Sequence, residues 1–279
     1  MLVARSVAEL RAARHEASGL VGLVPTMGYL HRGHISLVDA ARAECGTVVA
    51  SIFVNPTQFG PGEDFSRYPR NEEHDLELLE AAGVDAVLIP TVAEMYPEGD
   101  TARIHMDGLT DVLEGARRPG HFIGVATVVA KLFNIVQPDF AYFGRKDAQQ
   151  LAVIQGMARD LLMPITVVGC PIVREPDGLA CSSRNIYLSP EQRQQAASLS
   201  AGLRQAEAAF QDGVRDPEAL RNSVRRRIEQ ESLAAIDYVS LSDASTLREL
   251  ADPVEQPALL SLAVAFGPTH LLDNITLVP

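Results

Sequence analysis

The chain has 279 residues, of which 47% are hydrophobic and 22% charged, a globular composition that argues against intrinsic disorder. Its formal net charge of −12 argues against a nucleic-acid binder with a broad basic face. A site for a small anion remains compatible with this charge, because salt screens the effect of a charge beyond about 8 Å at physiological ionic strength. Cys45, Cys170 and Cys181 show neither metal-ligand spacing nor a disulfide framework, and no run approaches the ~20 apolar residues of a membrane span, so we expect a soluble cytoplasmic protein.

The first two thirds of the chain alternate between short β-branched runs and helical patterns, which is typical of a parallel sheet with helices on both faces. The N-terminal segment MLVARSVAELRAARHE lacks the apolar core of a signal peptide and predicts a helix. Strands are then expected over residues 21–25, 47–54, 86–89, 140–143 and 165–173. Helices are expected over residues 33–44, 72–82, 121–136 and 147–162. This pattern predicts a doubly wound, Rossmann-like α/β fold of the nucleotidyltransferase type.

The pattern changes after about Glu175. Ser189 and Pro190 are typical of a helix start and predict a long helix to about Gln211, followed by a second helix over residues 217–231. Strands are then expected over residues 236–241, 259–266 and 270–277, with a turn at Gly267-Pro268. We therefore expect a Rossmann-like domain over residues 1–175 and a second, smaller α+β C-terminal domain over residues 176–279 that is able to cover the site.

Polar clusters follow four of the expected strands. They read PTMGYLHRGH, NPTQF, GRKDAQQ and REPDGLACSSRN. Because ligands of open α/β sheets bind outside the carboxyl ends of the strands, we expect the four clusters to form one site.

The first cluster places two histidines at the start of a helix. His31 and His34 stand three residues apart, with Gly28 and Gly33 beside them. Unpaired N–H groups and the dipole at a helix start favour a phosphate, and glycine lets it come close. An imidazolium also donates hydrogen bonds to a phosphoryl oxygen. Neither histidine is expected to bind zinc, since no third ligand has a suitable spacing.

The later clusters supply cations and hydroxyl groups. The ammonium of Lys146, at ~4 Å from a phosphate oxygen, would contribute roughly 4 kcal/mol before desolvation at a dielectric constant near 20. A lone Lys-Asp pair is also a common surface feature, and Asp147 is expected at least to cap the following helix. Ser182, Ser183 and Arg184 offer two hydroxyls and a guanidinium to terminal phosphates, although this string is also common in turns.

Four further polar residues stand near these clusters. Gln58 and Gln150 are uncharged donor-acceptors, which suit hydroxyl and carboxylate recognition. His121 and Lys131, both in the helix expected over residues 121–136, are interpreted as packed or capping residues.

Taken together, these motifs resemble the pantothenate synthetase (pantoate–β-alanine ligase) family of ATP-dependent ligases. The matching strings are VPTMGYLHRGH, SIFVNPTQF, RYPR, RPGHFIGVATVVAKLFNIVQPD, FGRKDAQQL and REPDGLACSSRNIYL, which span most of residues 24–188. The resemblance implies that pantoate and ATP form pantoyl adenylate and pyrophosphate, and that the amine of β-alanine then displaces AMP. It also implies Mg²⁺ beside the phosphates and a homodimer.

The resemblance also implies roles for individual residues. His34 would be the proton donor, His31 a phosphate ligand, and Lys146 a third catalytic group. Gln58 and Gln150 would hold pantoate, with Gln58 also near β-alanine, and Asp75 is a candidate for the neighbourhood of the metal. ATP would be bound by Met27, Gly28, Tyr29, Leu30, His31, Arg32, Gly33, His34, Gly144, Arg145, Lys146, Asp147, Val173, Cys181, Ser182, Ser183 and Arg184.

Three positions depart from the family pattern. Arg145 stands where an acidic residue is usual, Ala148 replaces an aromatic residue and Cys181 replaces a methionine. We expect Arg145 to add positive charge beside the phosphates. Two other functions stay open: a nucleotidyltransferase that transfers AMP to a phosphate-bearing acceptor, and a non-catalytic nucleotide-binding module.

Overall fold

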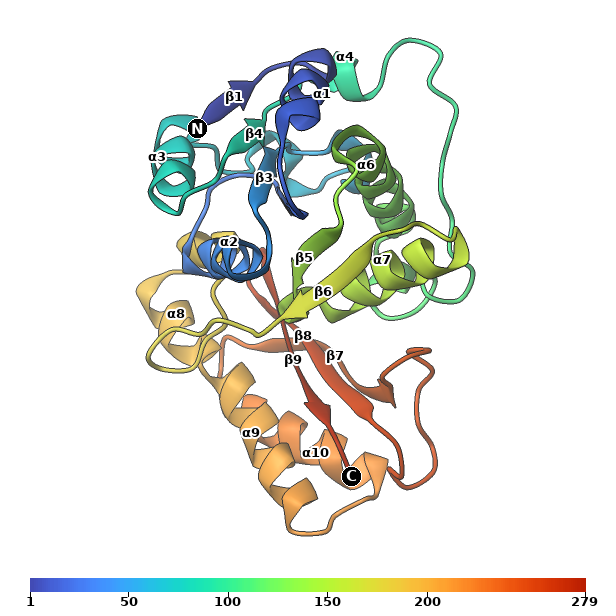
Figure 1. The fold of residues 1–279 in the computed structure, drawn as a ribbon. Helices are drawn as coiled ribbons and strands as arrows, with labels where there is room; N and C mark the ends of the chain where they lie inside the picture. The colour runs from blue at the N-terminus through green and yellow to red at the C-terminus, as the bar shows by residue number, and fades with distance from the viewer. The chain divides into compact units, whose positions relative to one another are not determined.

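The computed structural model describes the backbone of residues 1–279 and every side chain except that of Asp64. The chain forms two compact units (Figure 1). The first comprises Met1–Arg145 and Gln150–Pro171, and the second comprises Lys146–Gln149 and Ile172–Pro279. The domain boundary between residues 175 and 176 remains a prediction from the sequence, and this division into units does not test it.

A six-stranded parallel sheet forms the centre of the first unit. Its strands are β1 Leu2–Ala4, β2 Val21–Thr26, β3 Thr47–Ile52, β4 Ala86–Leu88, β5 Phe140–Gly144 and β6 Thr166–Cys170. They stand in the order β1-β4-β3-β2-β5-β6, so the direction of winding reverses between β2 and β5 (Figure 1). This order confirms the predicted doubly wound fold. Ligands of such sheets bind at the reversal, which singles out the segments that follow β2 and β5.

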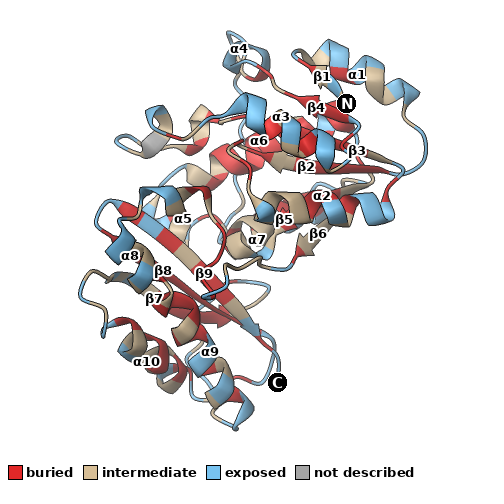
Figure 2. Ribbon diagram, turned by 90° about the vertical axis from the view of Figure 1, so that its left-hand side faces the viewer, coloured by how far each residue is buried: buried red, intermediate tan, exposed pale blue. Residues whose placement is uncertain are grey.

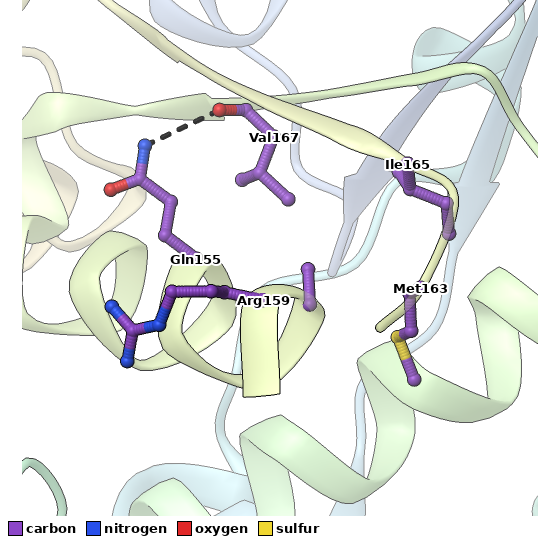
Figure 3. Close-up of a pocket in the computed structure, with 6 residues that line it drawn as sticks. Gln155, Arg159, Met163, Ile165 and Val167 are labelled. Atoms are coloured by element: carbon purple, nitrogen blue, oxygen red, sulfur yellow. Dashed lines mark hydrogen bonds between the residues drawn. The ribbon is translucent and has the colours of Figure 1, made fainter. Parts of the chain in front are cut away.

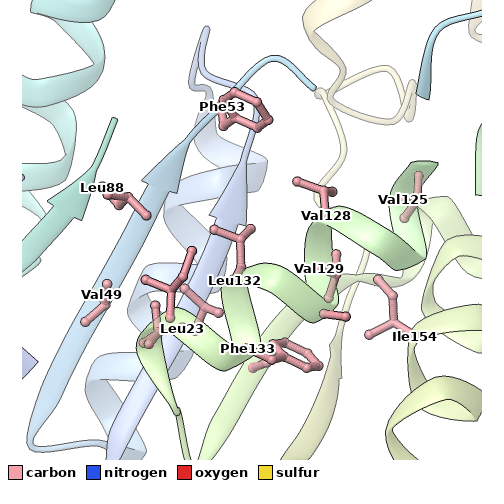
Figure 4. Packing of buried hydrophobic residues seen from close by; sticks show 14 of the residues in the cluster. Leu23, Val49, Phe53, Leu88, Val125, Val128, Val129, Leu132, Phe133 and Ile154 are labelled. Atoms are coloured by element: carbon pink, nitrogen blue, oxygen red, sulfur yellow. The ribbon is translucent and has the colours of Figure 1, made fainter. Parts of the chain in front are cut away.

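Both faces of this sheet are buried, because successive side chains of a strand point to opposite faces. On one face Leu23, Val49 and Leu88 pack with residues of α1, α6 and α7 (Figure 4). On the other face Val24 and Val48 pack with residues of α2 and α3. The helices are α1 Val7–Glu16, α2 Arg32–Glu44, α3 Glu72–Ala81, α6 His121–Val136 and α7 Ala148–Asp160. The four inner strands, β2 to β5, are accordingly buried along most of their length, whereas the edge strands β1 and β6 are partly exposed (Figure 2).

Short elements complete the connections after β3, β4 and β5. They are the helices α4 Val92–Met95 and α5 Glu114–Arg117 and the 3₁₀ turns η1 Pro56–Gln58, η2 Asp64–Ser66 and η3 Arg145–Asp147.

The second unit contains an antiparallel sheet packed against helices. Its strands β7 Ala235–Asp243, β8 Ala258–Phe266 and β9 Thr269–Leu277 stand in that order, and its helical elements are η4 Ser183–Tyr187, α8 Pro190–Ala196, α9 Ser198–Gln211 and α10 Pro217–Ile228. Leu203 of α9 and Leu220 of α10 are fully buried with Leu260 of β8 in one cluster. Full burial of each such leucine contributes about 2 kcal/mol. These elements confirm the predicted α+β character of the C-terminal part.

Two predicted elements differ from the structure. The first residues of the chain form β1, an edge strand paired with β4, before the predicted helix begins at Val7. The helix predicted over residues 190–211 is divided into α8 and α9 at Ala197, which keeps right-handed helical angles. The three residues of β1 run almost directly into the helical pattern of α1, so the sequence assigned them to the predicted helix. No described helix is long and apolar enough to cross a membrane.

Candidate active site

The loop after β2 is shaped by two consecutive residues with left-handed backbone angles. Gly28 has a φ of +81° and Tyr29 a φ of +52°. A Cβ on Gly28 would lie 2.9 Å from Asp75 Oδ2 and 3.0 Å from Ile52 Cγ2. This position therefore requires glycine for two reasons: the backbone angle is left-handed, and there is no room for a Cβ atom.

Asp75 of α3 holds this loop in place. Its side chain is buried, and its two oxygens accept the backbone N–H groups of Tyr29 at 2.8 Å and Leu30 at 2.7 Å. Burial raises the pKa of the Asp75 carboxyl, and the two N–H groups oppose that rise. The N–H of Gly28 is bonded as well, to Thr26 Oγ1 at 3.1 Å. The loop that precedes α2 is therefore held by hydrogen bonds within the protein.

The two histidines cap helix α2 through a reciprocal pair of hydrogen bonds. Nδ1 of His31 accepts the N–H of Gly33 at 3.1 Å, and Nδ1 of His34 accepts the N–H of His31 at 3.3 Å. A ring nitrogen that accepts a hydrogen bond carries no proton, so both rings are neutral here with their protons on Nε2. The ring centroids lie 4.1 Å apart. Two imidazolium ions at that distance would repel each other by about 4 kcal/mol at a dielectric constant of 20. In this arrangement both rings carry their N–H groups on Nε2.

Gln58 lies in η1, directly after β3, and meets the loop after β2. Helix α6 approaches η1 closely at Gly124, where a Cβ would lie 2.4 Å from the carbonyl oxygen of Thr57. Gln58 is buried; its Oε1 accepts from Asn55 Nδ2 at 3.2 Å, and its Nε2 donates to Met27 Sδ at 2.8 Å. The structure therefore brings Met27 and Gln58 together.

The backbone of Gln58 is held by α6. Its carbonyl oxygen lies 2.8 Å from His121 Nδ1, and because a carbonyl only accepts, Nδ1 carries the proton. The other ring nitrogen, Nε2, accepts from Arg118 Nη1 at 3.1 Å. Arg118 is paired in turn with Glu63 and holds the pKa of that carboxyl below its usual value. His121, interpreted from the sequence as a packed or capping residue, therefore positions Gln58.

The segment after β5 lies beside the edge of the sheet. Gly144 ends β5, and the Nε of the following Arg145 donates to the carbonyl oxygen of Gly169 in β6 at 3.0 Å. Part of the Arg145 guanidinium is therefore committed to the edge strand, which does not support the expectation that it faces phosphates. Its binding of ATP stays a prediction. Gln150 lies in the first turn of α7.

Lys146 and Asp147 belong to the second unit. The Lys146 Nζ lies 3.3 Å from Asp147 Oδ1, and its side chain is 20% exposed. The backbone carbonyl of Lys146 accepts from Asn274 Nδ2 at 2.8 Å, and Asn274 is a buried residue of β9. Asn274 thus fixes the backbone that carries Lys146. The sequence offered no signal for it, because a single asparagine in a strand forms no motif.

The remaining candidates form a hairpin in the second unit. The N–H of Cys181 donates to the carbonyl of Val173 at 2.9 Å, and its Sγ donates to Glu175 Oε1 at 3.3 Å. Ser182 caps η4, with its Oγ accepting from the N–H of Arg184 at 3.3 Å. Val173 and the segment Cys181, Ser182, Ser183 and Arg184 are thereby brought together.

Arg174 holds this hairpin against β9. It donates to Asp273 Oδ2 at 2.6 Å and Oδ1 at 2.9 Å, and to the carbonyl of Gly178 at 3.1 Å. Asp273 is buried, so the bidentate pair is protected from water. Neither Arg174 nor Asp273 was predicted from the sequence, since the two residues are 99 positions apart and share no local pattern.

The described residues contain no group of three or more His, Cys, Asp or Glu arranged to hold a metal ion. Both oxygens of Asp75 are already bonded to backbone N–H groups of the loop. Mg²⁺ requires oxygen ligands in near-ideal octahedral geometry. In the structure Asp75 shapes the loop.

A surface hollow lies along the edge strand β6 (Figure 3). Gln155 Nε2 donates to the carbonyl of Val167 at 3.3 Å within it. The residues that line it are Gln155, Ala158, Arg159, Met163, Ile165 and Val167. None of these is a candidate site residue.

Comparisons with known proteins agree over the whole chain. A family model described as pantoate-beta-alanine ligase matches residues 2–276. The pantothenate synthetase of Herpetosiphon aurantiacus is 54% identical, with 99% of this chain and 100% of the relative covered, and that of Chloroflexus aggregans is 56% identical, with 98% and 99% covered.

Solved structures show the same similarity. The pantothenate synthetase of Thermus thermophilus superposes with a TM-score of 0.94 at 50% identity and full coverage of both chains. The pantoate-beta-alanine ligase of Francisella tularensis, in complex with a β,γ ATP compound and β-alanine, has a TM-score of 0.81 at 33% identity, with 99% and 97% covered.

Proposed function

Because the chain belongs to the pantoate–β-alanine ligase family and ligates pantoate to β-alanine with ATP, we propose that the reaction passes through pantoyl adenylate. In the first step a carboxylate oxygen of pantoate attacks the α-phosphorus of ATP, and the bond to pyrophosphate breaks. In the second step the amine of β-alanine attacks the acyl carbon, AMP leaves with the electron pair of the C–O bond, and the amine loses a proton. Adenylation makes the second step feasible because AMP is a far better leaving group than an oxide ion.

The mutually capped histidine pair is the observation that carries this mechanism. The Nε2–H groups of His31 and His34 are fixed donors, since their Nδ1 atoms are held by the backbone. Pre-oriented donors stabilise the charge that develops on phosphate oxygens in the transition state, and the loss of one such donor costs about 10² to 10³ in rate. We assign His34 as the donor of an Nε2–H hydrogen bond to the departing oxygen and His31 as a phosphate ligand.

The rest of the ATP site is proposed on the two units described above. In the first unit the segment from Met27 to His34 and the pair Gly144 and Arg145 would contact the nucleotide. In the second unit Lys146 would supply an ammonium, with Asp147, Val173 and the segment from Cys181 to Arg184 beside it. The hydroxyl groups and guanidinium of that segment suit phosphate oxygens.

Gln58 and Gln150 are proposed to hold pantoate, with Gln58 also near β-alanine. The contacts of Gln58 support this role, because its side chain and its backbone are both held from within the first unit. A fixed carboxamide recognises a carboxylate or hydroxyl without competing as an acid or base.

Mg²⁺, the oligomeric state and the location are part of the same proposal. Mg²⁺ would enter with ATP on phosphate oxygens and water, which is its usual mode with nucleotides and needs no carboxylate cage. A homodimer is supported by Leu161 and Leu162, which are 53% and 88% exposed beside the edge strand β6. A cytoplasmic location suits the three free thiols of Cys45, Cys170 and Cys181.

Transfer of labelled oxygen tests the intermediate. Pantoate labelled with ¹⁸O in its carboxylate should pass one labelled oxygen to AMP, because the carboxylate oxygen becomes the bridge to the α-phosphorus. Pyrophosphate should also exchange into ATP in the presence of pantoate alone, whereas AMP should require β-alanine. Label found in pyrophosphate, or in neither product, would refute the adenylate.

A further inference from the structure

Tyr96, the residue that follows α4, reaches the buried polar groups around Gln58. Its hydroxyl lies 2.8 Å from Asn55 Oδ1 and 3.1 Å from Thr57 Oγ1. Burial raises the pKa of the Tyr96 phenol, so the hydroxyl keeps its proton at neutral pH and can donate it in a hydrogen bond. The reaction described above gives this tyrosine no task.

The partners of Asn55 leave its amide a single orientation. The side chain is fully buried, with an exposed fraction of 0%. One amide atom lies 3.2 Å from the carbonyl oxygen of Gly124, which only accepts, so this atom is Nδ2. The other receives the backbone N–H of Thr57 at 3.4 Å and the hydroxyl of Tyr96, so it is Oδ1. A 180° rotation of the amide would place donor against donor and acceptor against acceptor.

The orientation of Asn55 decides which atom Gln58 presents to a ligand. The second N–H of Asn55 Nδ2 points at Gln58, so the atom that receives it at 3.2 Å is Oε1. Nε2 then takes the position beside Met27 Sδ. A carboxamide held this way directs one N–H of Nε2 at Met27 Sδ and leaves the second N–H for a ligand. An N–H binds the oxygen atoms of a carboxylate or hydroxyl and disfavours an ammonium group.

We propose that Tyr96 is a positioning residue for the ligation reaction: its hydroxyl holds Asn55, and through Asn55 it keeps the second Nε2–H of Gln58 directed at the oxygens of pantoate. This inference rests on the proposed assignment of Gln58 to pantoate. It adds a residue outside the motifs and explains why a buried hydrogen-bond network surrounds a residue that binds substrate.

Lys131 of α6 fixes the ring of Tyr96. Its ammonium lies 4.3 Å from the ring centroid and donates at 2.7 Å both to Asp100 Oδ1 and to the carbonyl of Met95. A cation over the face of an aromatic ring is attracted to it, so the ammonium and its two acceptors hold the ring as well as the loop. Lys131 was interpreted from the sequence as a packed or capping residue, and this contact gives it a specific function.

The Tyr96→Phe variant tests the proposal, because it removes the hydroxyl and keeps the ring. We expect KM for pantoate to rise about five- to tenfold, the factor that corresponds to one lost hydrogen bond, and KM for ATP to stay within about twofold. Tyr142→Phe is the matched control: Tyr142 is fully buried, and its hydroxyl donates to Glu44 Oε2 at 2.8 Å on the other face of the sheet. It should leave both KM values within about twofold.

A double-mutant cycle separates positioning from a general loss of stability. In the Gln58→Ala background the positioned group is absent, so adding Tyr96→Phe should change pantoate affinity by less than about twofold. Affinity is measured by calorimetry with an unreactive ATP analogue present, so that slow turnover does not limit the cycle. The same five- to tenfold loss in both backgrounds would overturn the role of Tyr96. Unchanged pantoate affinity in Gln58→Ala alone would instead overturn the assignment of Gln58, and the inference with it.

Discussion

Replacement of His34 by asparagine separates its two roles, because each role uses a different ring nitrogen. Nδ1 accepts the N–H of His31 at 3.3 Å, and an asparagine Oδ1 stands at nearly the same distance from the backbone as Nδ1. The hydrogen bond is long, so its complete loss would lower the free energy of unfolding by only about 0.5 to 1 kcal/mol. His34→Asn should keep most of this stabilisation, because asparagine is a good helix cap. Nε2–H has no equivalent in asparagine. If it serves the phosphates, adenylate formation should fall by about 10² to 10³.

The assay is the pantoate-dependent exchange of labelled pyrophosphate into ATP, measured beside thermal unfolding. We expect His34→Asn to lose exchange while its Tm stays within about 4 °C of the wild type, since 1 kcal/mol corresponds to about 2 to 4 °C in a chain of this size. His34→Gln, whose amide nitrogen reaches the position of Nε2, should recover part of the exchange and lose part of the cap. An exchange rate within threefold of wild type in His34→Asn would refute the role of Nε2–H.

Three other side chains can be tested in the same way. Lys146→Ala should lower the exchange rate by about 10² to 10³ without unfolding the protein, because its partly exposed side chain forms an ion pair with Asp147 that is itself half-exposed. A near-normal rate would remove Lys146 from the mechanism. Cys181→Met should keep activity within about tenfold, or about 1.4 kcal/mol, and a loss of several orders of magnitude would reveal a specific task for the thiol. Hydrogen bonds from the Ser245 hydroxyl and the Thr246 N–H lower the pKa of Asp243 to about 2. The carboxylate therefore stabilises the folded chain above the pKa that Asp243 has in the unfolded chain, and this stabilisation is lost as the pH falls through the folded pKa. Asp243→Ala should therefore lower the free energy of unfolding by about 1 kcal/mol at pH 7 and by less as the pH falls toward 2, and an equal loss at both ends would contradict this linkage.

The sequence by itself predicted the helices and strands that bury one or both of their faces. Helix α6 has the predicted bounds, and five of the six strands of the parallel sheet were found near their observed positions, because periodicity of apolar residues reports burial directly. The order of motifs also predicted the family and its reaction. The family match over residues 2–276 then decides against a nucleotidyltransferase and a non-catalytic binding module.

Hydrogen-bond partners were decided by the tertiary structure. Asp75 lies 45 residues from Leu30, and Asn274 lies 128 residues from Lys146, so no local pattern links either pair. The sequence placed His31 and His34 at a helix start, whereas their reciprocal capping through Nδ1 became visible only in the folded loop. Burial can be read from the spacing of apolar residues, whereas the direction of a hydrogen bond depends on which distant atom the fold places opposite it.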